Sequence, residues 1–165
     1  MKKRTYQKIM KRIDAFRFGR RVVEAVDMVL TDVVAGFYIY VILMLYLFKQ
    51  YSVLLPIALV PAVSFVAVSL FRYFVNAKRP YEEYGFTPLI PKDTAGKSFP
   101  SRHVFSVFVI GTTVFFINPE LAVAIWILGA LLAVVRVISG VHFPRDVIAG
   151  AVIGIGCGML VKFFL

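Results

Sequence analysis

The sequence contains few of the residues on which several kinds of functional site depend. Its 165 residues include one cysteine, Cys157 in an apolar stretch, so the chain can form neither an internal disulfide nor a cysteine metal site. Asp and Glu total only nine and are scattered, which excludes a carboxylate cluster for Mg²⁺. No Gly-rich phosphate loop of the G-x-x-x-x-G-K-S/T kind is present. If the chain handles phosphate, its own cations must neutralise the phosphate.

Charged residues are also missing from long parts of the chain. Hydrophobic residues make up 60% of the sequence, the mean hydropathy is +0.83, and the apolar residues form continuous blocks. This composition excludes a soluble domain of this size and predicts a polytopic membrane protein built as one bundle. The first block begins near residue 28 without a small-residue cleavage pattern, so we expect no signal peptide.

Five uncharged runs are candidates for membrane-spanning helices. A spanning helix needs about 20 residues, and several of these runs are close to 15 residues long. Each short run must therefore include neighbouring charged residues, which then lie slightly inside the membrane boundary in a protein-lined cavity. The sequence predicts an all-α, polytopic membrane helix bundle with about five transmembrane helices. The runs are residues 33–48, 52–71, 104–119, 121–135 and 147–161.

Residues 1–27 form a strongly basic segment, with nine lysines and arginines against three carboxylates. We predict an amphipathic helix on the membrane surface here, with a frayed basic tail as the alternative. Its apolar face would consist of Ile9, Ile13, Phe16 and Phe18 or Val22. The net charge of +10 lies mainly outside the apolar runs, which favours anionic headgroups or phosphorylated substrates over nucleic acid as partners. Residues 28–165 would then form the transmembrane domain.

Residues 77–100 form a long connection rich in Pro, Gly and polar residues. Its side chains either contact a substrate or cap the end of the bundle, and we expect capping. The residues concerned are Tyr81, Glu82, Glu83, Tyr84 and Lys92.

In the last run, Gly150, Gly154 and Gly158 recur every four residues and give a helix a smooth face for the close approach of another helix. Packing within one chain and packing between two copies both explain this face. We expect packing within the monomer, and the sequence leaves open whether the protein is a monomer or a homodimer.

The first group of charged residues closes the second run, where Arg72, Arg79 and Pro80 occur. The arginines are seven residues apart, about two helical turns, so they lie on one face if the helix persists. Pro80 disfavours helical geometry at Arg79 and is expected to end the helix there. Two guanidinium groups on one face form a fork for phosphate oxygens, although such charges can also simply anchor a helix end.

The second group, Pro100-Ser101-Arg102-His103, opens the third run. Ser101 is a typical N-cap, and the free N–H groups of the first helical turn favour an anion. His103 follows in that turn, where it can give a proton to a leaving oxygen. A Pro-Ser pair before a helix is commonly only a cap, but a histidine at the entry to a membrane helix is less usual.

The third group lies between the last two runs and contains Arg136, His142, Pro144 and Asp146. Pro144 suits the first turn of a helix. His142 then precedes that turn and Asp146 lies in it. The carboxylate can therefore reach one imidazole nitrogen, fix the tautomer and leave the other nitrogen free to react. Charges beside apolar runs mark a functional site by default, and a basic loop at the membrane surface is the alternative.

All three groups face the same side of the membrane. With five helices, the ends of the second and fourth and the starts of the third and fifth lie on one side. Charged groups that only anchored helix ends in the membrane would not all be expected on one side. The sequence therefore predicts one common site.

The three groups together resemble the pattern of the type 2 phosphatidic acid phosphatase (PAP2) family, which includes bacterial lipid phosphatases, glucose-6-phosphatase and vanadium haloperoxidases. The resemblance covers about residues 50–165. The family pattern K-x6-RP, PSGH and SR-x5-H-x3-D appears here as Arg72-x6-Arg79-Pro80, Pro100-Ser101-Arg102-His103 and Val135-Arg136-x5-His142-x3-Asp146. Arg72 replaces a lysine, Arg102 a glycine and Val135 a serine, and the change at Arg102 leaves substrate choice open.

The resemblance implies that residues 28–165 form the catalytic domain of a metal-independent lipid phosphatase without a cofactor. His142 would attack phosphorus and form a phosphohistidine, Asp146 would orient His142, and His103 would protonate the leaving group. The phosphate oxygens would be bound by Arg72, Arg79, Ser101, Arg102 and Arg136.

We expect undecaprenyl diphosphate as the substrate, followed by phosphatidylglycerol phosphate or phosphatidic acid. We also expect a multi-pass protein of the bacterial plasma membrane whose site faces the outside. The basic N-terminus on the same side argues for the cytoplasmic face instead. The alternatives are a small transporter or anion channel, a vanadate-dependent peroxidase, and a pseudoenzyme that only binds lipid phosphate. Transport is disfavoured because the polar residues stop at one end of each run.

Overall fold

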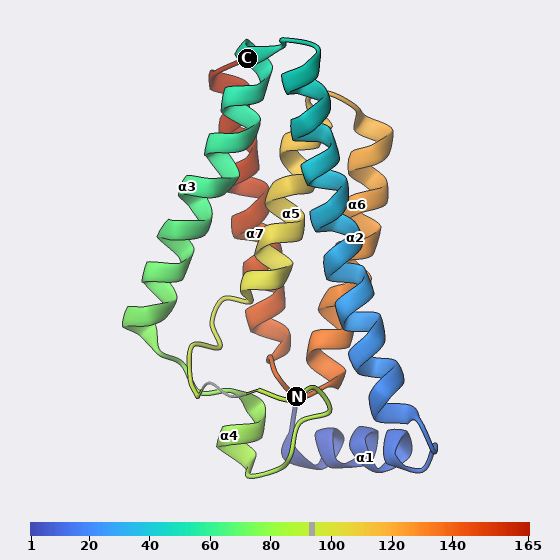
Figure 1. Cartoon of the computed structure of the whole chain (residues 1–165). Coiled ribbons are helices and arrows are strands. Elements are labelled where there is room, and N and C mark those ends of the chain that lie inside the picture. The colour runs from blue at the N-terminus through green and yellow to red at the C-terminus, as the bar shows by residue number, and fades with distance from the viewer. Residues whose placement is uncertain (93–94) are drawn as a thin grey trace.

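A bundle of five apolar helices forms the protein, and two short helices lie at one end of it (Figure 1). The computed structural model describes residues 1–92 and 95–165. The bundle helices are α2 (Gly19–Leu47), α3 (Tyr51–Val75), α5 (Arg102–Phe115), α6 (Pro119–Ile138) and α7 (Pro144–Met159), the last continued by a 3-10 turn (Leu160–Phe163). The end helices are α1 (Lys3–Asp14) and α4 (Pro80–Tyr84).

Four helices are long and apolar enough to cross a membrane, namely α2, α3, α6 and α7 with its 3-10 turn, and α5 is a shorter apolar helix. Large apolar side chains cover the outside of the bundle. Leu59, Val63, Ile127 and Val152, for example, are each more than half exposed, which suits contact with lipid and would be unfavourable in water. The predicted all-α membrane bundle with about five transmembrane helices is confirmed.

The central helix is α5, which contacts each of the other four bundle helices (Figure 1). Its 14 residues rise by only about 21 Å, less than the roughly 30 Å of a hydrocarbon core. Its N-terminus therefore lies higher in the view of Figure 1 than the nearby ends of α6 and α7. The start of α5 is thus recessed from the end of the bundle, where Ser101 is buried, His103 is half-buried and Arg102 is exposed.

Glycines of α7 bring its backbone into contact with α5. A Cβ atom added to Gly150 would lie 2.7 Å from the carbonyl oxygen of Ser101. One added to Gly154 would lie 2.7 Å from the carbonyl oxygen of Phe105, and Gly158 is equally crowded. The prediction that this glycine face packs within the monomer is confirmed.

We expect Gly154→Val to destabilise the protein by about 1–3 kcal/mol, because the added side chain overlaps the α5 backbone. Gly156→Val is the matched control, since no heavy atom lies within 4 Å of a Cβ atom placed there. The midpoints of thermal unfolding in detergent compare the two variants. Equal midpoints would contradict the close contact of α5 and α7.

The amphipathic N-terminal helix is also confirmed, as α1, and it lies across the end of the bundle (Figure 1). Its buried face differs from the predicted one. Tyr6 and Met10 are buried, whereas Ile9 and Ile13 are half-buried and Phe16 is exposed. The physical reason is that loop aromatic rings of the protein itself, rather than lipid alone, cover this face of α1.

The helix α2 begins at Gly19, earlier than the first uncharged run, and continues without a break through residues 27 and 28. The break between α1 and the bundle lies at residues 15–18. The division of the chain at residue 28 into two functional parts stays a prediction.

Candidate active site

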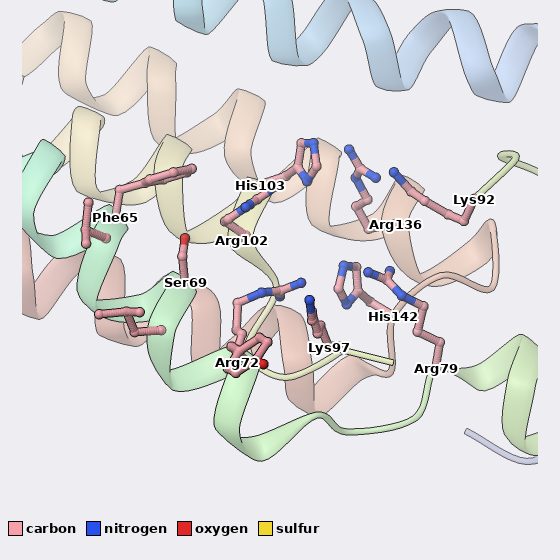
Figure 2. A pocket seen from close by; sticks show the side chains of 13 residues that line it. Phe65, Ser69, Arg72, Arg79, Lys92, Lys97, Arg102, His103, Arg136 and His142 are labelled. Atoms are coloured by element: carbon pink, nitrogen blue, oxygen red, sulfur yellow. The ribbon is translucent and has the colours of Figure 1, made fainter. Parts of the chain in front are cut away.

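A cavity of about 510 Å³ opens at the end of the bundle that carries α1 and α4 (Figure 2). The end of α3, the start of α5, the end of α6 and the adjoining loops line it, so the structure brings the three charged groups together. Its polar lining residues are Arg72, Arg79, Lys92, Lys97, Arg102, Arg136, His103, His142, Ser69 and Tyr73. Among the described residues, no three His, Cys, Asp or Glu side chains gather to hold a metal ion.

The two arginines of the first group reach the cavity from different elements. Helix α3 ends at Val75, and Asn76 adopts a left-handed conformation with φ 41°, which asparagine tolerates better than most residues. The chain therefore leaves the helix before Arg79, which takes the N-cap position of α4. The expectation that Pro80 ends the helix at Arg79, with Arg72 and Arg79 on one continuous helical face, was wrong.

Backbone carbonyl groups orient both guanidinium groups. Arg72 Nη1 donates to the carbonyl oxygen of Pro100. Arg79 donates from Nε to the carbonyl oxygen of Gly96 at 2.9 Å, and from Nη1 to that of Val141 at 3.1 Å. Both side chains are buried. Neutral carbonyl groups fix their positions without cancelling their charge, so the arginines remain suited to an anion.

Ser101 occupies the predicted N-cap position of α5, but its side chain makes no cap hydrogen bond. Its Oγ is buried and has no hydrogen-bond partner within the described parts of the chain. Its backbone N–H donates to the carbonyl oxygen of Asp146 at 2.8 Å and ties the start of α5 to α7. Ser101 is not among the residues that line the cavity, so a ligand role for its hydroxyl group stays a prediction.

Arg102 and His103 follow in the first turn of α5, and both side chains line the cavity. The guanidinium group of Arg102 lies 5.2 Å from the ring centre of Phe65 on α3, a cation–π arrangement. The side chain of Arg102 thus lines the cavity, and whether it contacts phosphate stays a prediction. His103 lies beside Arg136 in Figure 2.

His142 lies in the loop between α6 and α7, where only 2% of its surface is exposed. Its Nδ1 is 3.4 Å from Ser98 Oγ and 3.6 Å from Asp146 Oδ2. Ser98 Oγ donates to the same carboxylate oxygen at 2.5 Å. The carboxylate lies next to the imidazole, as expected, but Ser98 links the two and was missed. Because Nδ1 faces these groups, Nε2 is the nitrogen left for reaction.

The start of α7 explains how Asp146 is placed. The helix begins at Pro144, as predicted, and Asp146 falls in its first turn. Its Oδ2 accepts a hydrogen bond from the backbone N–H of Phe143 at 2.9 Å, which is a typical capping contact. The carboxylate is thus fixed by the helix start as well as by Ser98.

Burial lowers the pKa of His142 to about 4, and the charges of Arg79 and Arg136 act in the same direction against the influence of Asp146. The imidazole is therefore neutral at pH 7. An unperturbed histidine has a pKa of about 6.5, so between these values the unfolded chain binds more protons. Stability from this group consequently falls as the pH drops from about 6.5 through about 4.

The chain has two histidines, so His103→Asn leaves His142 as the sole imidazole. We expect the NMR resonance of its ¹³C-labelled ring carbon, recorded in detergent, to titrate with a midpoint near its lowered pKa of about 4. A midpoint at or above that of a free histidine would contradict the burial of a neutral imidazole.

The counter-ion of Arg136 comes from α2. Arg136 Nε lies 2.8 Å from Asp27 Oδ1, and the arginine side chain is 2% exposed. Its Nη1 is buried without a hydrogen-bond partner among the described residues, so this nitrogen can serve an anion. The prediction placed Asp27 only within the basic N-terminal segment. The missed signal was a carboxylate within a helix long and apolar enough to cross a membrane, because such a carboxylate usually has a partner.

We expect Asp27→Asn to destabilise the protein by about 3–5 kcal/mol, because it leaves Arg136 as a buried charge without a counter-ion. The double variant Asp27→Asn/Arg136→Gln removes both charges and should recover much of the loss. Glu24→Gln, an exposed carboxylate of the same helix, is the control. Thermal unfolding in detergent measures all three, and a double variant less stable than Asp27→Asn would contradict the pairing.

Tyr6 of α1 supports the loop that carries His142. The side chain is fully buried, and its hydroxyl group donates to the carbonyl oxygen of His142 at 3.2 Å. Burial raises the pKa of Tyr6, so the hydroxyl group stays protonated as a donor. Its ring stacks on Phe86 with centres 5.6 Å apart. No sequence pattern indicated this contact, which joins positions 136 residues apart.

The loop of residues 77–100 contributes more to the cavity than expected. Glu82 does tie the loop together, accepting hydrogen bonds from the backbone N–H of Gly96 at 2.8 Å and of Arg79 at 2.7 Å. Lys92 and Lys97, however, line the cavity. Lys92 was named for substrate contact or capping, with capping expected, and it lies in the cavity lining instead. Lys97 was missed, because a lysine in a polar loop is usually solvated.

The fold and the cavity define the class of protein: an integral membrane helix bundle with a recessed, cationic site that contains two histidines. The sequence model of the PAP2 superfamily matches residues 52–164, and the chain belongs to this superfamily. The family predicted from the three charged groups is confirmed.

Two relatives are similar in sequence. The chain is 33% identical over 110 residues to an undecaprenyl-diphosphatase of Sulfolobus acidocaldarius, which covers 64% of this chain and 51% of that protein. It is 38% identical over 58 residues to the bacitracin transport permease protein BcrC of Bacillus licheniformis, which covers 35% of this chain and 29% of that protein. The chain thus spans about half the length of these relatives or less.

Two solved structures are similar in fold. LpxE of Aquifex aeolicus gives a TM-score of 0.69 at 25% identity over 86% of each chain. A PAP2-type phosphatidylglycerolphosphate phosphatase of Bacillus subtilis gives 0.73 at 20% identity, over 97% of this chain and 84% of that one. The second likeness, at 20% identity, concerns the fold alone.

Proposed function

We propose that this protein is an integral membrane lipid phosphatase that removes the terminal phosphate of a lipid phosphate or diphosphate through a phosphohistidine. The observation that carries the proposal is the setting of His142. Its Nδ1 lies against Ser98 and Asp146, and the residue lines a cavity with six lysines and arginines. Membership of the PAP2 superfamily adds support.

In the first proposed step, the lone pair of His142 Nε2 forms a bond to the terminal phosphorus while the P–O bond to the lipid breaks in line. Arg72, Arg79 and Arg136 stabilise the charge on the phosphate oxygens. Ser101, with the N–H groups that begin α5, adds donors to the same phosphate. When the leaving group is a lipid alcohol, His103 gives its oxygen a proton.

In the second proposed step, a water molecule attacks the phosphohistidine. The P–N bond breaks and returns its electron pair to His142, while His103 accepts the proton of the water. Asp146 and Ser98 keep Nδ1 as the protonated nitrogen and stabilise the positive charge that His142 carries in the intermediate. These steps use no metal ion and no cofactor.

An apolar groove supports a lipid as the substrate. Two hollows of about 450 and 230 Å³ continue from the cavity along α5, and both share Phe65 with it. The larger lies between α2, α3 and α5 and is lined by Tyr38, Ile39, Ile42, Ala58, Pro61, Ala62, Phe65, Ser106, Val109 and Ile110. The smaller includes Arg102 and His103. A phosphate in the cavity would thus have room for an apolar chain beside it.

Undecaprenyl diphosphate is the substrate that we propose first, since an undecaprenyl-diphosphatase is among the similar sequences. Phosphatidylglycerol phosphate and phosphatidic acid follow. The name of the second relative suggests transport. A permeation path needs polar groups along its length, whereas the hollow that continues from the cavity is mostly apolar.

We place the protein in the bacterial plasma membrane with the cavity facing the outside. The N-terminus lies at the cavity end of the bundle and the C-terminus at the other end (Figure 1), as an odd number of spans requires. Whether the protein acts as a monomer or a homodimer is open.

The experiment that tests this function measures phosphate release by the purified protein in detergent with EDTA, from undecaprenyl diphosphate, phosphatidic acid and phosphatidylglycerol phosphate. We expect metal-independent release that falls by at least about 10⁴-fold in His142→Ala, since the covalent path is lost. Lys162→Ala, an exposed residue of the 3-10 turn Leu160–Phe163 that does not line the cavity, is the control. A His142→Ala variant as active as the wild type would rule out the phosphohistidine.

A further inference from the structure

Three cations line the cavity in addition to the arginines that match the family pattern in charge. Arg72, Arg79 and Arg136 are those three arginines, whereas Arg102 replaces a glycine. Lys92 and Lys97 come from the loop before α5. A single phosphate group carries at most two negative charges, which is less than the charge gathered here.

The nearby carboxylates are already engaged elsewhere. Asp27 pairs with Arg136, Asp146 accepts from Ser98, and Glu82 accepts from backbone N–H groups. Within residues 1–92 and 95–165, Lys97 and Arg102 have no carboxylate partner. Burial and the charge of Arg136 lower the pKa of Lys92. The effect of Arg136 indicates that positive charge is also in excess near Lys92.

Lys97 and Arg102 lie on the lipid side of the cavity. Lys97 Nζ is 5.0 Å from the ring centre of Tyr73, and Arg102 lies over Phe65. Both rings belong to α3, and Phe65 also lines the apolar groove. In the view of Figure 2, Arg102 and Lys97 lie between Phe65 and His142. Lys97 also adopts a left-handed conformation with φ 53°, which is rare for lysine and typical of functional positions.

We propose that Lys97 and Arg102 form a second phosphate subsite, which binds the lipid-proximal phosphate of a lipid diphosphate while the terminal phosphate lies at His142. This inference rests on the proposed function and makes lipid diphosphates the preferred substrate class. A lipid monophosphate places only its one phosphate at His142 and leaves this subsite unused.

The subsite also suits the chemistry of the leaving group. When His142 Nε2 bonds to the terminal phosphorus, the bond from that phosphorus to the bridging oxygen breaks, and the electron pair stays on the lipid monophosphate. A phosphate has a second pKa of about 6, so this group leaves at pH 7 without an added proton. Lys97 and Arg102 would stabilise the charge that develops on it.

The test compares farnesyl diphosphate with farnesyl phosphate, which share one apolar chain, by phosphate release in detergent. We expect the double variant Lys97→Gln/Arg102→Gln to lose at least about tenfold more kcat/KM on the diphosphate than on the monophosphate. Lys78→Gln, an exposed lysine outside the cavity lining, should leave the ratio of the two substrates at its wild-type value. Equal losses on both substrates, or an unchanged ratio in the double variant, would overturn the subsite.

A binding measurement separates this inference from the proposed function. We expect inorganic pyrophosphate to raise the unfolding temperature of the wild type more than orthophosphate at equal concentration, and the double variant to lose this difference. If the wild type hydrolyses neither farnesyl substrate but shows the difference, the proposed function fails and the subsite stands. If pyrophosphate and orthophosphate stabilise the wild type equally, the subsite fails whatever the activity.

Discussion

The close contact between α5 and α7 fixes the geometry on which the cavity depends. Gly150 lets the α7 backbone approach Ser101 at the start of α5. The N–H of Ser101 then donates to the carbonyl oxygen of Asp146 at 2.8 Å. Backbone atoms therefore hold together the two helix starts that carry His103 and Asp146. A site supported by packed backbone keeps its geometry while charges on its side chains change.

The electrostatics of the cavity follow a second constraint, which is that the cations must be held in place without being neutralised. Carbonyl groups of the loop before α5 and of the His142 loop orient Arg72 and Arg79. Among the cavity cations, and within the residues that the structure describes, only Arg136 has a carboxylate partner. One nitrogen of this arginine, Nη1, remains without a hydrogen-bond partner there. Dipoles that orient charges in this way leave a positive field, so the cavity is preorganised for an anion.

The N-terminal part of the chain contributes to this arrangement although it lies outside the residues that match the PAP2 superfamily. Asp27 of α2 reaches Arg136, and Tyr6 of α1 donates to the carbonyl oxygen of His142. These contacts join α2 to the C-terminal end of α6 and α1 to the loop that follows α6. The segment therefore supports the site.

The sequence by itself determined the helices, because long uncharged runs can form only buried or membrane-spanning helices. It also determined that the three charged groups share one side, which follows from the order of five spans. The placement of Asp146 near His142 was local, since Pro144 starts a helix between them. These properties depend on neighbours in the chain and on counting, so no tertiary contact was needed to infer them.

Only the tertiary structure decided which other residues meet the cavity. Arg79 reaches it because Asn76 ends α3 early, and Ser98 joins His142 across 44 positions. Tyr6, Asp27, Lys92 and Lys97 likewise act through contacts between distant segments or through a loop without regular structure. Their positions depend on how the helices pack and on the conformation of the loop that covers them. Neither the packing nor the loop conformation can be predicted from the residue types alone.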